Sequence, residues 1–298
     1  MDIRELSAED SDRIYRLRED SWIGYDRAVQ VRAQIESLLN RPKSHRPQNI
    51  ALLGESNNGK TMLIRNFCRR HNPPDDPNLE QTILPALHVQ TPGGPEEWRL
   101  YYKILLHLNA ASSSKEPVDS MLYRIATILK HLQTRILFLD DFFNAAAGTP
   151  KQRSRFLNGL RNLSTEIEIP IVIAGVPESL HILSSDPSII NRFTPVYLVK
   201  WKEDQLENFA RLVLSLEAQL LLKRPCNLMT TNALHGLLAF SEGLIGEVVA
   251  ILRLLAESAI RSGTEMIDET MITKKNLARL GWVAPSDRNR TIAASDFY

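Results

Sequence analysis

A short polar loop that follows an apolar run constrains the fold of this chain more than any other feature. Residues 50–53 (IALL) are apolar, and GESNNGKT at 54–61 follows them directly. The pattern G-x-x-x-x-G-K-[ST], placed after a strand and before a helix, predicts a loop whose backbone N–H groups point at phosphate oxygens. We therefore expect a buried parallel strand, this loop, and a helix over about 60–71.

The loop predicts a nucleotide site that takes ATP together with Mg²⁺. Lys60 would reach the β- and γ-phosphates as a point charge, and the Thr61 hydroxyl would be a ligand of Mg²⁺. The candidate contacts to the nucleotide in this loop are Gly54, Asn57, Asn58, Gly59, Lys60, Thr61 and Met62.

A pair of carboxylates follows a second apolar run, RILFLDD at 135–141. The carboxyl ends of parallel strands are where ligands bind in open α/β sheets, which places Asp140 at the expected site. We predict that Asp140 holds Mg²⁺, directly or through water, and that Asp141 orients or deprotonates the attacking water. The strand PALHVQT (85–91) falls between the loop and this carboxylate, which favours the additional-strand ATPases over kinases and GTPases.

Apolar strands that alternate with helices predict an α/β fold with a parallel sheet covered on both faces. Five strands are expected, at 50–54, 85–91, 136–140, 170–176 and 196–201. After Trp201 the pattern becomes helical, at 203–223, 230–240, 245–262 and 270–280. We expect an N-terminal helical segment at 1–45 that packs on the nucleotide site, an ATPase core at 46–201, a small all-helical lid domain at 202–280, and a flexible tail at 281–298.

Composition adds little to this prediction. The 298 residues carry a formal net charge of +1, so bulk charge predicts neither a nucleic-acid binder nor an enzyme for acidic substrates. The two cysteines, Cys68 and Cys226, match no metal-site spacing. The polar N-terminus is unlike a signal peptide, and the apolar stretch near 248–260 carries Arg253 and Glu257. A cytoplasmic protein with no membrane partner is expected.

Four stretches resemble TniB and the related TnsC, which are AAA+ ATPases that regulate DNA transposition. They are WIGYDRA at 22–28, GESNNGKT at 54–61, QRSRFLNGLRNLSTEIEIPIVIAGVPES at 152–179 and INRF at 190–193. The similarity runs from about residue 10 to residue 280. It implies an ATP-dependent binder of target duplex DNA that self-associates into a ring or helical filament. It also implies recruitment of a DDE transposase (TniA- or TnsB-like) and placement by a TniQ-like targeting protein.

The resemblance assigns further residues to the site. Arg192 matches the arginine that AAA+ proteins offer to the γ-phosphate of the neighbouring subunit, where it supports hydrolysis only in the assembled state. Trp22, Ile23 and Tyr25 match the segment that packs against the adenine in this family. Lys60, Thr61 and Asp140 match the phosphate-loop pair and the magnesium carboxylate.

The chain departs from the family pattern at three positions. Asp141 stands where a longer glutamate is usual, and Val176 stands where a polar sensor residue is expected. The sensor arginine of the second domain has Arg253 as a possible counterpart, because the 246–247 position is Gly-Glu. These departures favour ATP as an assembly switch with slow hydrolysis.

Two basic clusters predict contacts to the DNA backbone. Arg99 and Lys103 lie near the start of one expected helix, and Lys151 and Arg153 lie at the start of another. Helix N-termini add backbone N–H groups to phosphate binding, so sequence-independent contacts to duplex DNA are expected.

Two alternatives remain open from the sequence. The first is another oligomeric AAA+ ATPase, such as a replication initiator or a helicase loader. The second is a nucleotide-gated scaffold that binds ATP, scarcely hydrolyses it, and assembles partners without a catalytic role.

Overall fold

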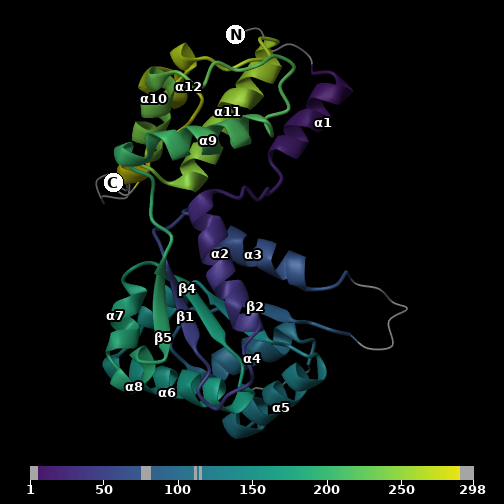
Figure 1. Ribbon diagram of the computed structural model, residues 1–298, viewed down its shortest axis with the longest axis vertical. Coiled ribbons are helices and arrows are strands. Elements are labelled where there is room, and N and C mark those ends of the chain that lie inside the picture. The colour runs from purple at the N-terminus through teal and green to yellow at the C-terminus, as the bar shows by residue number, and fades with distance from the viewer. Residues whose placement is uncertain (1–5, 75–81, 111–112, 114–115, 289–298) are drawn as a thin grey trace, which may run out of the picture. The chain divides into compact units, whose positions relative to one another are not determined.

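The computed structural model describes residues 6–74, 82–110, 113 and 116–288, which form two compact units (Figure 1). The sheet unit comprises Asp26–Leu198, and the helical unit combines the residues before Asp26 with those after Leu198. The N-terminal segment expected at 1–45 therefore contributes one helix to each unit, namely α1 (Ala8–Leu17) and α2 (Asp26–Leu39). The sequence also predicts polar loops at 71–82 (HNPPDDPNLEQT) and 111–117 (ASSSKEP), and parts of both lie outside the described residues.

A parallel sheet of five strands, counted over the described residues, confirms the predicted α/β fold class. The strands are β1 (Asn49–Leu53), β2 (Ala86–Gln90), β3 (Ile136–Asp140), β4 (Ile171–Gly175) and β5 (Phe193–Tyr197), in the order β2-β3-β4-β1-β5. Every residue of β1, β3 and β4 is buried, as continuous apolar runs predict for strands covered on both faces. The carboxyl ends of β1 and β3 thus lie at one edge of one sheet.

The last strand begins and ends earlier than the sequence pattern predicts. The expected range was 196–201, whereas β5 pairs with β1 from Phe193 to Tyr197. Only Phe193 and Val196 are buried in this edge strand, and it contains Pro195, which edge positions tolerate. The weak apolar signal of a half-exposed edge strand explains the shifted prediction.

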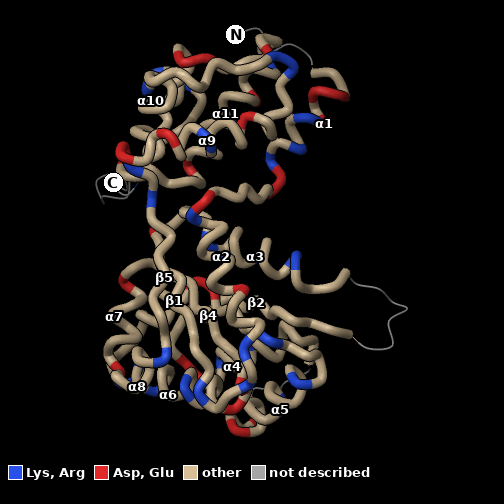
Figure 2. The backbone as a smooth tube through the Cα atoms, in the orientation of Figure 1, with Lys and Arg blue, Asp and Glu red and all other residues tan. Residues whose placement is uncertain are grey.

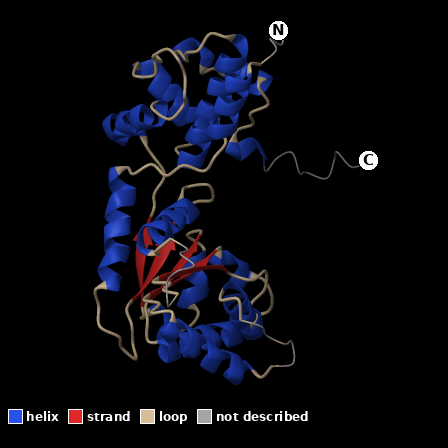
Figure 3. Cartoon of the chain, turned by 90° about the vertical axis from the view of Figure 1, so that its right-hand side faces the viewer, coloured by secondary structure: helices blue, strands red, loops and turns tan. Residues whose placement is uncertain are grey.

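Helices cover both faces of the sheet (Figure 3). On one face, the Phe67 ring of α3 (Lys60–His71) lies 5.1 Å from the Phe138 ring of β3, and α2 packs beside α3. On the other face, α4 (Glu97–His107), α5 (Val118–His131) and α6 (Pro150–Ile167) pack on one another and on the alternate strand residues. The remaining elements of this unit are η1 (Phe142–Ala146), α7 (Ser179–Ser184) and α8 (Pro187–Ile190).

The helical unit is built from α1 and the C-terminal helices. These are α9 (Leu206–Glu217), α10 (Thr231–Ser241), α11 (Ile245–Ser262), α12 (Lys274–Arg279) and α13 (Pro285–Arg288), with η2 (Glu203–Gln205) and η3 (Glu269–Met271) between them. Arg13 of α1 pairs with Glu265 at 2.5 Å and donates to the Leu221 carbonyl, which joins α1 to the C-terminal part of the chain. No helix in the described part of the chain has the length and apolarity needed to cross a bilayer.

The start of the segment expected to be a flexible tail makes several contacts. The Trp282 ring packs edge-on against Phe240, and Arg288 forms two hydrogen bonds with the buried carboxylate of Glu247, at 2.6 and 2.7 Å. The backbone N–H of Ser286 donates to Glu242. A lack of periodicity therefore did not mean a lack of partners for these residues, while 289–298 lie outside the described residues.

Candidate functional site

Backbone geometry accounts for both glycines of the 54–61 loop. The Gly54 N–H donates to the Gly175 carbonyl at 3.1 Å, and a Cβ at position 54 would lie only 2.6 Å from the Leu198 carbonyl oxygen. Gly59 has φ +85°, a left-handed conformation that disfavours other residues. The loop therefore leaves β1 between its neighbours β4 and β5 and turns directly into α3.

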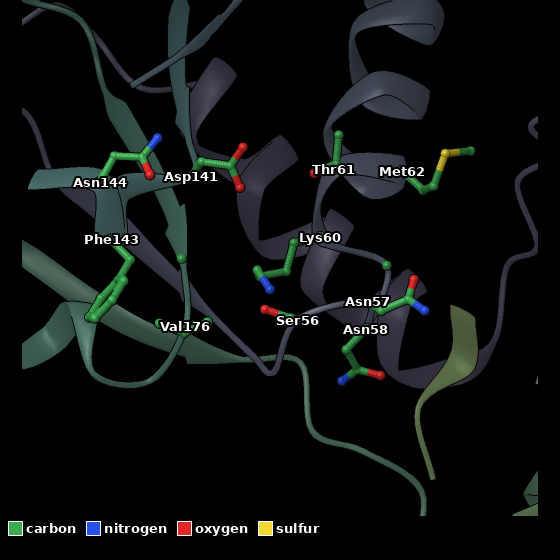
Figure 4. Close-up of a pocket in the computed structure, with 12 residues that line it drawn as sticks. Ser56, Asn57, Asn58, Lys60, Thr61, Met62, Asp141, Phe143, Asn144 and Val176 are labelled. Atoms are coloured by element: carbon green, nitrogen blue, oxygen red, sulfur yellow. The ribbon is translucent and has the colours of Figure 1, made fainter. Parts of the chain in front are cut away.

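A cavity of about 460 Å³ lies over this loop. Its walls come from 56–62, from Asp141 and the residues that follow β3, and from Gly175 and Val176 at the end of β4. Figure 4 shows Lys60 between the Thr61 side of the cavity and the side that carries Phe143 and Asn144. The residues predicted for phosphate binding are thus gathered around one cavity at the carboxyl edge of the sheet.

Lys60 bridges the two ends of its own loop. Its Nζ donates to the carbonyls of Gly54 and Glu55 at 2.7 and 2.8 Å. Burial lowers the pKa of Lys60, and the nearby carboxylates of Asp140, Asp141 and Glu55 act in the opposite direction. An ammonium group that is buried beside these acids gains a strong partner when a phosphate enters the cavity.

Thr61 and Asp140 form the pair that fits Mg²⁺. The Thr61 hydroxyl donates to Asp140 Oδ2 at 2.7 Å, and His88 Nε2 lies 3.4 Å from the same oxygen. Burial would raise the pKa of Asp140, but the nearby His88 and hydrogen bonds from Thr61 and the Asp141 N–H lower it below its usual value. An ionised carboxylate beside a hydroxyl suits Mg²⁺, which keeps several waters and binds substrate phosphates instead of needing many protein ligands.

Asp141 lies on the cavity wall but already has a partner. It adopts a left-handed backbone conformation with φ +53°, and its Oδ2 accepts a hydrogen bond from Gln90 Nε2 at 2.7 Å. Its backbone N–H donates to Asp140 Oδ1 at 2.9 Å. A water that Asp141 orients through this oxygen would therefore have to displace the Gln90 amide.

The other loop candidates differ in what their side chains do. Asn58 is buried, and its Nδ2 donates to the Leu198 carbonyl at 2.7 Å, which ties the loop to the end of β5. Asn57 has φ +58° and lines the cavity together with Met62. Asn57 and Met62 thus remain candidates for contact with a nucleotide, while Asn58 supports the loop.

Three residues in or near the cavity, His88, Gln90 and Asn144, were not predicted from the sequence. His88 and Gln90 belong to β2, which pairs with β3 so that Gln90 lies opposite Asp140. His88 and Gln90 are polar residues near the end of a strand that is otherwise largely apolar, and this pattern could have indicated a role at the site. Asn144, which lines the cavity and donates to the Thr91 carbonyl, gave no signal because it lies in a short 3-10 helix.

The residues predicted to contact adenine lie in the helical unit, whereas the phosphate loop lies in the sheet unit. Ile23 and Tyr25 are buried, and the Tyr25 ring packs against the Trp201 ring with centroids 5.3 Å apart. Trp22 is half-buried. Their contact with a nucleotide stays a prediction.

Arg192 lies at the amino end of β5, away from the phosphate loop of its own chain. Its Nη1 lies 3.2 Å from the Thr165 hydroxyl, and its buried Nε has no hydrogen-bond partner among the described residues. Burial, together with the positive charges of Arg46 and Arg161, lowers its pKa. No ion pair joins any of these three arginines to a carboxylate in the described part of the chain.

The two basic clusters predicted for DNA lie on neighbouring helices. The Tyr101 hydroxyl of α4 donates to the Gly159 carbonyl of α6 at 2.9 Å. A Cβ at Gly148, just before α6, would lie 3.1 Å from Pro95, just before α4. The beginnings of the two helices therefore lie side by side.

Exposure differs among the four side chains of these clusters. Lys151 is exposed, and Lys103 and Arg153 are partly exposed. Arg99 is exposed, but it pairs with Glu96 and lies over the Trp98 ring. Lys103, Lys151 and Arg153 are thus the cations of the two clusters best placed to meet an external phosphate.

Arg253 and Glu247, the two residues considered for the position of the second-domain sensor arginine, both bind other residues of this chain. Arg253 donates to the Glu19 carbonyl and lies 3.4 Å from the Ser21 hydroxyl. Glu247, the acidic residue at the alternative position, is buried and bound by Arg288. Both side chains therefore contribute contacts within the helical unit.

Comparisons with known proteins agree with this geometry. The family model described as "Bacterial TniB protein" matches residues 13–203. No curated protein matches the sequence. Among solved structures, ORC2 of Aeropyrum pernix in ADPNP–ADP complexes matches with TM-score 0.64 and 14% identity, over 88% of this chain and 71% of that one.

Two further solved structures have the same fold. Cdc6p of Pyrobaculum aerophilum matches with TM-score 0.59 and 19% identity, over 89% of this chain and 70% of that one. ORC1 of Aeropyrum pernix in complex with DNA matches with TM-score 0.61 and 15% identity, over 90% and 68%. At these identities the likeness shows a shared fold.

Proposed function

The chain belongs to the bacterial TniB family, and from this premise we propose that it is an ATP-dependent AAA+ regulator of DNA transposition. It binds target duplex DNA, self-associates there into a ring or helical filament, and recruits the transposase. The observation that supports the proposal is the cavity lined by Lys60 and Thr61, where the Thr61 hydroxyl donates to Asp140 at the carboxyl end of β3. Hydrolysis of ATP then controls disassembly.

The residues in and beside the cavity have separate roles in binding ATP. The loop N–H groups and Lys60 bind the phosphates, and Thr61 and Asp140 would hold Mg²⁺, which would neutralise part of the phosphate charge. Asp141 orients the attacking water once Gln90 releases it. Arg192 acts on the ATP of a neighbouring subunit, because its guanidinium has no carboxylate partner among the described residues.

Hydrolysis should be slow in the native chain and faster in the Asp141→Glu variant. The carboxylate of Asp141 is short and is bound by Gln90 at 2.7 Å, so it reaches poorly towards a water. A positioned general base contributes roughly 10²–10⁴-fold to a rate, so partial recovery of this effect predicts an increase of about tenfold. Steady-state phosphate release with duplex DNA measures it.

Asp141→Asn is the matched control, because it keeps the size of the side chain but removes the charge. It should release phosphate more slowly than the native chain. An Asp141→Asn variant as fast as the native chain would show that Asp141 has no part in hydrolysis.

DNA binding tests the proposal as a whole. We expect salt-sensitive binding of duplex DNA that requires ATP or a nonhydrolysable analogue, and electron microscopy of that mixture should show rings or filaments. Lys103→Ala combined with Lys151→Ala should weaken DNA binding by at least about tenfold, because each subunit loses two phosphate contacts. The dependence of the DNA affinity on salt concentration should fall as well. Fluorescence anisotropy at several salt concentrations measures both effects.

Lys274→Ala with Lys275→Ala is the control for this experiment. Both lysines are exposed in the helical unit and form no ion pair among the described residues, so the same charge is removed elsewhere. Equal losses in the two double variants would reject the assignment of Lys103 and Lys151 as DNA contacts.

The DDE transposase and the TniQ-like targeting protein are proposed as partners from family membership. Purification of the ATP-bound chain with each candidate partner tests them. The likeness to ORC and Cdc6 structures favours a second candidate, a replication initiator or helicase loader. Association with a replicative helicase, and with no transposase, would select that alternative.

A nucleotide-gated scaffold is a third candidate, favoured by the hydrogen bond between Gln90 and Asp141. It would assemble with ATP on DNA but show no phosphate release above that of the Lys60→Ala variant. Turnover measured with and without DNA separates it from the proposed ATPase.

A further inference from the structure

A second polar pocket lies at the opposite edge of the sheet, where β3 and β4 begin. We call it the amino-edge pocket. Its volume is about 340 Å³, and its polar lining consists chiefly of Arg41, Lys43, Lys130, Thr134, Arg135 and Glu168. Figure 2 shows Lys and Arg positions gathered at this end of the sheet unit. None of these residues belongs to the candidate nucleotide site.

The shape of the amino-edge pocket follows from how two helices end. Gln133, just after α5, and Glu168, just after α6, have φ of +55° and +54°. These left-handed residues end both helices sharply, so that β3 and β4 begin within a few residues. The pocket walls therefore combine these helix ends and strand starts with residues 41–43, which lie between α2 and β1.

Positive charge dominates the amino-edge pocket. Four cations line it, and Glu168 is the one carboxylate in its lining, already 2.7 Å from His45 Nδ1. Arg41 donates to the Gln48 amide, and in the described part of the chain none of the four cations pairs with a carboxylate. The four cations and Glu168 leave three positive elementary charges, and the C-terminal ends of α2, α5 and α6 each add about −0.5 of a charge. The net charge at the pocket is therefore roughly +1.5.

Thr134 places a hydroxyl group without a hydrogen-bond partner among the described residues beside these cations. It is only 2% exposed, it lines the pocket, and its Oγ1 has no hydrogen-bond partner among the described residues. Its backbone N–H is satisfied by the Leu129 carbonyl at 2.9 Å, so only the side chain lacks a partner. Buried hydroxyl groups in folded proteins are normally hydrogen-bonded, and this one belongs to a residue that lines the amino-edge pocket.

We propose that the amino-edge pocket is a binding site for a phosphate group. A phosphate monoester carries about −1.5 to −2 charges, which matches the net positive charge, and its oxygens can accept from donors on several walls at once. Guanidinium, ammonium and hydroxyl groups are the usual side-chain donors to phosphate. A single carboxylate has half the charge and two oxygens, so it fits this donor set less well.

Inorganic pyrophosphate is the probe, titrated by calorimetry into the Lys60→Ala variant, in which the phosphate loop is impaired. The readout therefore does not depend on whether the proposed ATPase function is correct. Adding Lys130→Ala and Arg135→Ala should weaken binding by at least about tenfold, because two charge-assisted contacts are lost. Adding Lys274→Ala and Lys275→Ala removes the same charge from the helical unit and should change the affinity less than about twofold.

Thr134→Val guards against loss of folding as the explanation. It removes the buried hydroxyl with little change in shape, so the thermal unfolding temperature without ligand should not fall. Pyrophosphate affinity should nevertheless fall by about threefold or more. An unchanged pyrophosphate affinity in both the Thr134→Val and the Lys130→Ala/Arg135→Ala variants would overturn the proposal.

Two further arms identify the source of the phosphate. If duplex DNA, with a nonhydrolysable ATP analogue present, binds more weakly to the Lys130→Ala/Arg135→Ala variant of the otherwise native chain, the phosphate belongs to nucleic acid. If only pyrophosphate binding falls, the ligand is a small phosphorylated molecule. Polyglutamate that binds the pocket as tightly as pyrophosphate would overturn the phosphate assignment in favour of an acidic protein segment.

Discussion

Replacing Lys60 with alanine is expected to reduce ATP affinity by at least about a hundredfold. Among the residues that line the described cavity, Lys60 is the only cation, and its Nζ lies at the loop carbonyls of Gly54 and Glu55. A hydrogen bond to a charged group contributes roughly 1.5–3 kcal/mol, so the loss of contacts to two phosphates corresponds to about 3 kcal/mol or more. Calorimetric titration with ATP and Mg²⁺ measures the loss.

Lys274→Ala is the control, since it removes one exposed ammonium from the helical unit. It should bind ATP like the native chain. The Lys60→Ala variant should also keep the native circular-dichroism spectrum, because the loop is tied to the sheet by Gly54 and Asn58. An ATP affinity within about threefold of the native value would remove Lys60 from the phosphate site and with it the basis of the proposed function.

The parts of the fold that the sequence predicted are those with a strong local signal. Continuous apolar runs predicted β1, β3 and β4, which are buried over their whole length. The loop pattern predicted that Thr61 and Asp140 meet, although 79 positions separate them in the sequence. Parallel strands explain this success, because they bring their carboxyl ends to one edge whatever the connections between them.

The parts that the sequence could not predict depend on pairing between distant residues. The partner of Asp141 is Gln90 because β2 lies beside β3, and strand order is not encoded in a local pattern. The placement of α1 in the helical unit involves the ion pair between Arg13 and Glu265, which are 252 positions apart. Asn58 matches the phosphate-loop pattern, yet its side chain points to the Leu198 carbonyl. Sequence spacing therefore predicted which residues gather at the candidate site, whereas their hydrogen-bond partners depend on the fold.

The second large effect is expected from Arg192→Ala. ATP binding by this variant should be unchanged, because Arg192 lies at the amino end of β5 and not around the candidate nucleotide cavity of its own chain. DNA-stimulated phosphate release should fall by about 10³-fold, the lower bound usually seen when a trans arginine is lost. Arg211→Ala is the control, since it removes an exposed arginine that pairs with Glu207 on α9.

Mixing two inactive variants decides whether Arg192 acts on a neighbouring subunit. In a head-to-tail assembly, an equal mixture of Arg192→Ala and Lys60→Ala subunits places an intact phosphate loop beside an intact Arg192 at about a quarter of the interfaces. Phosphate release should therefore recover to at most about a quarter of the native rate, far above the rate of either variant alone. If Arg192 served the cavity of its own chain, no subunit in the mixture would carry a complete site, and the mixture would stay as inactive as its parts.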